Sequence, residues 1–192
     1  MIELLAALSA SAAAGMRIAL PLLVIGLLQS DDLWSKIPLL AHIHPAVLLC
    51  ILTSWSLFEL FASKKLLGQR ILQVFQLILS PIVGAIMGIT VAQITETPVQ
   101  FLWIIGIVGG LLALVIQLVL VGWFYRLKGL PLWFVFIEDF LCIALVIFAF
   151  DAPRQGGLIA LLLLWMAIRS SKQWHRWYIE KNRHPHKRQM PD

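Results

Sequence analysis

Long apolar stretches, separated by short polar connections, make up most of the chain. We predict helices over six of them, at residues 4–28, 45–63, 71–91, 101–125, 132–150 and 156–168. At about 1.5 Å of rise per residue most can cross the ~30 Å of a bilayer's hydrocarbon, and the sixth does so only by continuing into Ser170 and Lys172. The pattern predicts an all-α integral membrane protein, with a six-helix transmembrane bundle over residues 1–170 and a tail over residues 171–192.

Composition and charge indicate that the bundle lies in a membrane and which way it is oriented. Hydrophobic residues make up 60% of the chain and charged residues 13%, with a mean hydropathy of +0.90. In soluble domains about a quarter of the residues are charged. The net charge is +5, and 12 of the 15 Lys and Arg residues lie in the second-to-third connection, the fourth-to-fifth connection and the tail. We expect both termini to be cytoplasmic in a bacterial inner membrane, and nucleic acid is not an expected partner.

Four ionisable residues interrupt the apolar stretches: Arg17, Glu59, Glu138 and Asp139. A charged side chain costs about 2.5 to 3.5 kcal/mol at a bilayer centre, so each should face inward and find a partner. Along ideal helices, Glu59 lies about 6 Å from the cytoplasmic end of its helix, and the Glu138–Asp139 pair lies about 9 to 11 Å from that side. We therefore expect a charge cluster in the inner half of the membrane.

The charge balance of this cluster leaves two interpretations open. Three acids and one Arg carry an excess of two negative charges if all are ionised. An acid is then protonated, a cation is bound, or basic residues of the connections approach, such as Lys64, Lys65, Arg126 and Lys128. The four residues are therefore either structural pairs or a site for a proton, a cation or another substrate.

Polar residues recur at helical spacing on two of the predicted helices. The second carries Thr53, Ser56, Glu59 and Ser63, and the third carries Gln69, Gln73, Gln76 and Ser80. Such a stripe either lines a water-filled path or holds helices together by hydrogen bonds. As candidates for a polar path we take Thr53, Ser56, Gln73, Gln76 and Ser80.

Prolines and small residues indicate how the helices bend and approach one another. Pro21 and Pro81 each lack an N–H donor, so we predict a kink in the first helix, with a free carbonyl at Arg17, and another in the third. Ridges of small residues allow close helix contacts within one chain or between copies. They are formed by Ser11 with Gly15, Gly84 with Gly88, and Gly106 with Gly110.

The tail and the remaining polar residues indicate lipid contact rather than catalysis. Trp174, Trp177 and Tyr178 alternate with basic residues such as Arg176, which is typical of a helix at an interface with anionic lipid, followed here by a disordered end. The pairs His42–His44 and His184–His186 lack a full ligand set, so we expect no metal, and no cofactor motif is present. Cys50 and Cys142 are expected at different depths, as packed apolar residues.

Several of these residues carry a resemblance to a known family. They are the segment Ser11-Ala-Ala-Ala-Gly-Met-Arg17 with Leu20-Pro21-Leu22-Leu23, then Glu59, Pro81 with Gly84-Ala85, Gly109-Gly110 with Ala113, and Glu138-Asp139. Over residues 9–170 the chain resembles the bacterial multipass membrane family catalogued as domain of unknown function 4126. It departs from that pattern at Ser63-Lys64, where the family has Asp-Lys, and at Gln117, where the family has a His. The resemblance implies a small integral membrane protein without an assigned activity.

Two functions of different classes remain. In the first, the protein moves a proton, a cation or a small solute, with Arg17 as the counter-ion and the acids as protonatable or cation-binding groups. In the second, it is a non-catalytic scaffold or assembly factor whose glycine ridges bind a membrane-protein partner or a second copy. An enzyme is disfavoured because no nucleophile and base are paired in any recognisable motif.

Overall fold

A computed structural model describes residues 2–28, 45–62, 66–95, 98–127 and 132–183, and within these ranges all regular secondary structure is helical. Three helices are long and apolar enough to cross a membrane, over Arg70–Ile94, Gln100–Arg126 and Trp133–Asp151. The all-helical prediction is therefore confirmed. The helices are α1 (Ile2–Met16), α2 (Ala19–Leu28), α4 (Pro45–Ala62), α5 (Leu66–Ile94), α6 (Val99–Leu127), α7 (Leu132–Asp151) and α8 (Pro153–Arg183).

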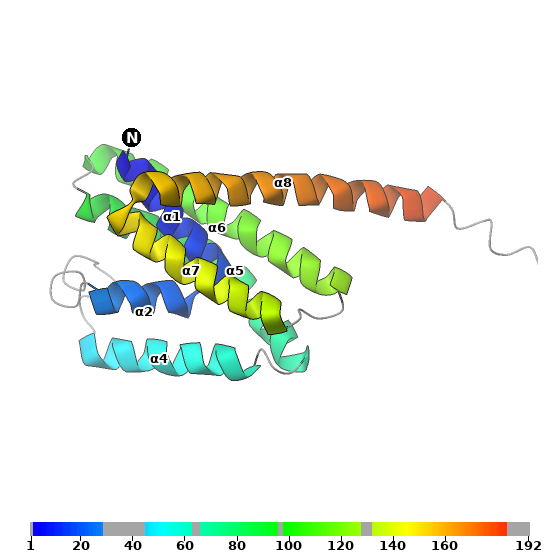
Figure 1. Ribbon diagram of the computed structural model, residues 1–192, viewed down its shortest axis with the longest axis horizontal. Coiled ribbons are helices and arrows are strands. Elements are labelled where there is room, and N and C mark those ends of the chain that lie inside the picture. The colour runs from blue at the N-terminus through cyan, green and yellow to red at the C-terminus, as the bar shows by residue number, and fades with distance from the viewer. Residues whose placement is uncertain (1, 29–44, 63–65, 96–97, 128–131, 184–192) are drawn as a thin grey trace, which may run out of the picture.

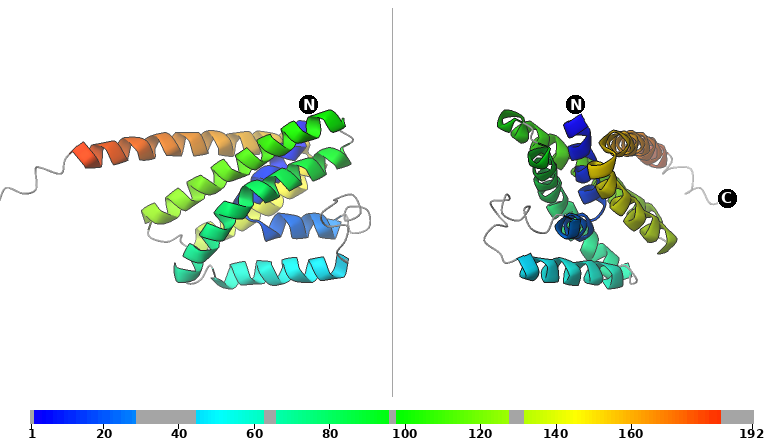
Figure 2. Two further views of the ribbon diagram at one scale, coloured as in Figure 1. Left: turned by 180° about the vertical axis from the view of Figure 1, so that it is seen from behind. Right: turned by 60° about the vertical axis from the view of Figure 1, so that its left-hand side comes forward.

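Helix α1 occupies the centre of the bundle. It contacts α5, α6, α7 and α8, and Figure 2 shows it lying between α5 and α6 on one side and α7 and α8 on the other. Most of its residues are Ala, Ser or Gly, and every residue from Ser9 to Met16 is buried. Small side chains let four neighbouring helices approach a single central one.

The first apolar stretch forms two helices rather than the single one expected over residues 4–28. The helix ends at Met16, Arg17 and Ile18 lie outside regular helix, and α2 starts at Ala19. The chain also reverses its direction there, as both views agree (Figures 1 and 2). The break places Pro21 in the first turn of α2, where a missing N–H donor has no consequence. Pro81, in contrast, lies inside α5, which continues past it.

This reversal changes where the two ends of the chain lie. The first turn of α1 and the last turn of α8 are at opposite ends of the bundle (Figure 1). The sequence predicts six membrane crossings with both termini on one side, and the first of these crossings is residues 4–28. Helices α1 and α2 run in opposite directions and so do not form the single continuous helix expected over residues 4–28.

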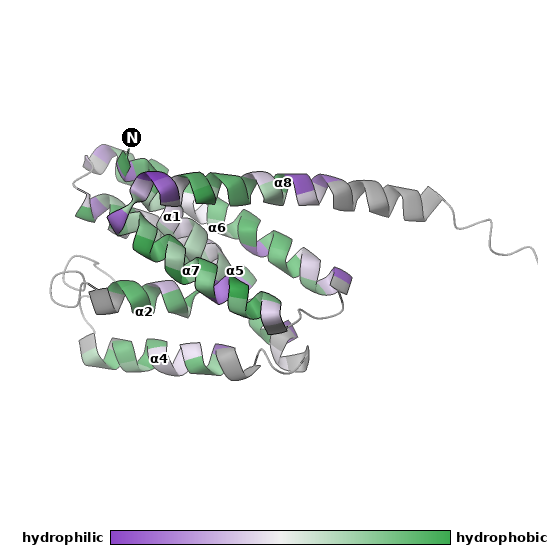
Figure 3. Ribbon diagram, viewed as in Figure 1, coloured by the Kyte–Doolittle hydropathy of each residue, from purple (hydrophilic) through white to green (hydrophobic). Residues whose placement is uncertain are grey.

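The bundle is apolar outside and partly polar inside. Large apolar side chains are exposed along its helices, among them Trp103, Phe136 and Phe140, which are 79%, 66% and 75% exposed. Figure 3 shows hydrophobic residues along most of the length of the described helices. Buried polar residues include Arg17 and Gln117. Such an arrangement suits a hydrocarbon environment, since the exposed apolar surface far exceeds what a water-soluble monomer shows.

Small residues meet one another where α1, α5 and α6 come together. A Cβ added to Gly15 would lie 2.7 Å from Cα of Ala113, and one added to Gly110 would lie 2.7 Å from the carbonyl oxygen of Pro81. The Ser11 hydroxyl donates to the Gly84 carbonyl at 2.9 Å. The glycine ridges are therefore occupied by neighbouring helices of the same chain.

Candidate functional site: a buried charge cluster

The break between α1 and α2 holds Arg17 inside the protein, at 6% exposure. Its guanidinium lies within ion-pair distance of three acids from two other helices. Nε is 2.8 Å from Oδ1 of Asp139 and 3.9 Å from Oε1 of Glu138, both on α7, and a terminal nitrogen is 4.0 Å from Oε2 of Glu59 on α4. The structure thus brings together the four ionisable residues that the sequence singled out.

The contacts within this cluster are unequal. Asp139 is the closest acid, but the Nε–H of Arg17 is not directed at its oxygen, so the contact is an ion pair without an aligned hydrogen bond. Glu59, at 3% exposure, accepts a hydrogen bond of 2.9 Å from the indole nitrogen of Trp55 on its own helix. Glu138 is 7% exposed and its nearest charged partner is Arg17. The closest ion pair therefore involves the most exposed of the three acids, with Asp139 at 16% side-chain exposure.

Two glutamines extend the cluster across the bundle. Gln76 on α5 donates to Glu59 at 3.4 Å, and Gln117 on α6 donates to Gln76 at the same distance. Both are buried. Gln117 and Trp55 were not predicted as site residues. The available signal was an isolated Gln within the apolar run of α6, and a Trp four residues before Glu59, one helical turn away.

The three α5 residues predicted for the polar path face the interior, whereas the two predicted on α4 do not. Gln73, Gln76 and Ser80 are buried, and the side-chain oxygens of Gln73 and Ser80 have no hydrogen-bond partner in the described protein. Buried polar atoms without a protein partner are typical places for ordered water or a ligand. On α4, Thr53 is exposed and its hydroxyl donates to the Leu49 carbonyl of its own helix, and Ser56 is half-buried.

The two acids of α7 outnumber the guanidinium that they share. The Arg17 guanidinium faces both Glu138 and Asp139, in an interior where removing an ion from water costs several kcal/mol. A second cation from the connections would have to be Lys64, Lys65 or Lys128, which fall outside the described residues. The described site therefore has too little positive charge, and a bound proton or cation would balance its carboxylates.

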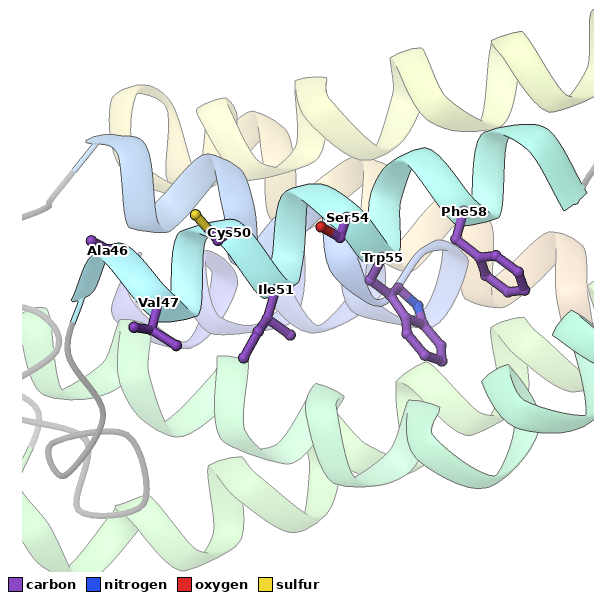
Figure 4. A pocket seen from close by; sticks show the side chains of 7 residues that line it. All are labelled: Ala46, Val47, Cys50, Ile51, Ser54, Trp55 and Phe58. Carbon is purple, nitrogen blue, oxygen red and sulfur yellow. The ribbon is translucent and has the colours of Figure 1, made fainter.

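A surface hollow adjoins the cluster on α4. It has a volume of about 680 Å³ and is lined by residues of α4 alone. Val47, Ile51, Trp55 and Phe58 project from one side of the helix (Figure 4). Among the described residues only α4 lines the hollow, which is linked to the cluster through the hydrogen bond from Trp55 to Glu59.

The other residues predicted from the sequence lie apart from this site. Trp174, Arg176, Trp177 and Tyr178 belong to α8, but their side chains are outside the described part, as are both His pairs. Within the described residues no group of three potential ligands is placed to hold a metal ion. Cys50 is exposed in the α4 hollow, and Cys142 is buried with its thiol 3.5 Å from the Ala13 carbonyl oxygen.

An apolar exterior, helices long enough to cross a membrane and a buried charge cluster define a helical protein of the membrane type. The chain belongs to the family described as a domain of unknown function (DUF4126), whose model matches residues 4–173. The family resemblance seen in the sequence is thus confirmed. No curated protein and no solved structure matches the chain.

Proposed function

We propose that this protein is a multipass protein of the bacterial inner membrane and moves a proton, a cation or a small solute through the cluster of Arg17, Glu59, Glu138 and Asp139. The observation that carries the proposal is the single buried guanidinium among three acids. Fully ionised, Arg17 with Glu138 and Asp139 alone would have an excess of one negative charge in a water-poor interior. An exchangeable positive charge relieves that excess, and its exchange between the two sides of the membrane is transport.

The α5 polar face supplies the route in this proposal. Gln76 and Gln117 connect Glu59 to the middle of α6, and the unpartnered oxygens of Gln73 and Ser80 lie on the same helix as Gln76. Water bound to these oxygens would continue the hydrogen-bonded path along the bundle. Thr53 is not part of this route because it faces away from the interior.

The proposed topology has five crossings and one hairpin. At about 1.5 Å per residue, α1 with 15 residues and α2 with 10 span about 22 and 15 Å, which is too short for a bilayer. Among the described helices, α5, α6 and α7 have the length and apolar composition for a crossing. We add one crossing each for α4, with 18 residues, and for α8, with 31. The end of the bundle with Arg70 and Arg126 faces the cytoplasm by the positive-inside rule, so the C-terminus is inside and the N-terminus outside.

The scaffold alternative loses its main support because the glycine ridges are filled by helices of the same chain. A second copy or a protein partner would instead have to use the apolar outer surface, which lipid also covers. We further propose that the basic, aromatic end of α8 contacts anionic lipid at the cytoplasmic face and that the protein is not an enzyme.

Flux through reconstituted protein tests the proposal. Purified protein in liposomes is challenged with gradients of protons, Na⁺, K⁺ and small organic cations, and internal pH or ion content is recorded. We expect flux of at least one of these species, and its loss in Glu59→Gln, which keeps the size of the side chain but removes its charge. Absence of flux for every species, with a stoichiometric protein partner copurifying, would favour the scaffold.

A further inference from the structure

A cavity that is partly open to the outer surface lies between α6, α7 and α8. Its volume is about 380 Å³, within the range of about 300 to 1,000 Å³ that small-molecule sites occupy. Nearly all its lining residues are apolar, and Met16, next to Arg17 in the sequence, forms part of the wall. The cavity therefore reaches the break where the cluster is held.

Glu138 is the ionisable residue among those that line this cavity. It is 7% exposed, and no hydrogen bond to its carboxylate is found within the described protein, where its nearest charged partner is Arg17 Nε at 3.9 Å. Arg17 lies closer to Asp139, at 2.8 Å from the same nitrogen. A carboxylate in apolar surroundings that shares its cation with a closer acid is stabilised by a proton or by a cationic ligand.

Aromatic side chains line the cavity one helical turn from this carboxylate. Phe134 precedes Glu138 by four residues on α7, about 6 Å along the axis, and its ring is 5.8 Å from that of Trp123 on α6. The indole N–H of Trp123 donates to Ser170 on α8 at 2.8 Å, which ties the three walls together. Aromatic faces attract organic cations, most strongly where water is excluded.

From this combination we infer that the cavity between α6, α7 and α8 binds a singly charged lipophilic cation, with its charge against Glu138 and its apolar body against Trp123, Phe134 and Leu162. A cation is favoured over a neutral lipid chain because Glu138 and Asp139 share one guanidinium, and a bound cation would balance the second carboxylate, which an acyl chain would not. This inference names a substrate class for the proposed function. Movement of the cation across the membrane rests on that proposed function, whereas binding of the cation does not and can be measured separately.

Equilibrium binding of two probes of nearly equal size and opposite charge tests the site. The protein in lipid nanodiscs is titrated with tetraphenylphosphonium and with tetraphenylborate, and the partition into empty nanodiscs is subtracted. We expect saturable binding of one phosphonium per chain and no saturable binding of the borate. Equal binding of both ions, or phosphonium uptake that does not saturate, would overturn the inference.

Matched variants locate the bound ion. Glu138→Gln should weaken phosphonium binding at least about tenfold, whereas Asp151→Asn, the same charge change at the exposed end of α7, should leave it within about twofold. Leu162→Trp should fill the cavity and weaken binding, whereas Leu161→Trp, also exposed on α8 but outside the cavity, should not. Size-exclusion profiles show whether each variant is folded. The comparison of Leu162→Trp with Leu161→Trp tests the site even where Glu138→Gln misfolds. Unchanged binding in Leu162→Trp contradicts the site.

The binding data also separate this inference from the proposed transport. Saturable, Glu138-dependent binding in a protein that moves no ion supports the ligand site and removes the transport. Flux of protons or metal cations without saturable phosphonium binding supports the transport and overturns the ligand site.

Discussion

Nε of Arg17 lies 2.8 Å from Oδ1 of Asp139, across the point where the first apolar stretch breaks. Glu59 and Glu138 surround the same guanidinium at 4.0 and 3.9 Å. One side chain thus holds the α1–α2 break against α4 and α7.

Removal of Arg17 should destabilise the protein severely. Arg17→Met leaves three buried carboxylates without their counter-charge, and breaking a buried ion pair costs about 3 to 5 kcal/mol. The double variant Arg17→Met with Asp139→Leu should recover part of the loss. Thermal unfolding in detergent compares the wild type, Arg17→Met, Asp139→Leu and the double variant, with Arg154→Met, an exposed Arg of α8, as the control. Strictly additive effects of the two single substitutions would show that the residues do not interact.

Gly15 should not tolerate a methyl group. Its added Cβ would lie 2.7 and 2.8 Å from the Cα and the carbonyl oxygen of Ala113, so α1 and α6 must separate. We expect Gly15→Ala to lower the free energy of unfolding by about 1 to 3 kcal/mol. Gly122→Ala is the matched control, since nothing lies within 4 Å of its added Cβ, and it should be neutral or stabilise α6 by up to about 1 kcal/mol. Equal effects at the two positions would disprove the close packing of α1 and α6.

Polar residues of α5 and α4 should respond differently to apolar substitution. Gln76→Leu removes both the donor to Glu59 and the acceptor for Gln117, and should cost about 1 to 3 kcal/mol and reduce flux. Thr53→Val removes only a hydroxyl bonded within its own exposed turn, so its effect should stay within about 0.5 kcal/mol. Stability and flux measured on the same preparations decide the comparison. Wild-type flux in Gln76→Leu would exclude this residue from the route.

The two ends of the chain should be accessible from opposite sides of the membrane. In a background with Cys50 and Cys142 replaced by Ala, a single thiol is introduced by Ile2→Cys or by Lys172→Cys, both at exposed positions. A membrane-impermeant maleimide added to intact spheroplasts should label the first at once and the second only after permeabilisation. Protection of both thiols until permeabilisation would restore the six-crossing topology with both termini inside.

Much of the helical framework was predictable from hydropathy alone. The predicted segment at residues 45–63 corresponds to α4, and that at residues 132–150 to α7, within one residue at each end. Depth estimates along these helices also placed Glu59 near Glu138 and Asp139. These quantities depend on local sequence and helix rise, which tertiary packing changes little.

The reversal at Arg17 and the cavity beside Glu138 were not predictable in this way. A continuous apolar run with one Pro favours a kinked helix, and the break is stabilised by contacts of Arg17 with acids more than 40 residues away in sequence. The shape of the cavity depends on how α6, α7 and α8 are rotated about their axes. The hydrogen bond from Gln117 to Gln76 depends on the rotation of α6 in the same way. Helical periodicity alone does not determine that rotation when apolar residues surround a helix on all sides.

The most direct test of the central claim compares Glu138→Gln with Asp151→Asn in the liposome flux assay. Both substitutions remove one negative charge from α7, but only the first removes it from the buried cluster. The charge-cluster mechanism predicts that flux is abolished in Glu138→Gln and retained in Asp151→Asn, with both proteins folded. Full flux in Glu138→Gln would contradict it.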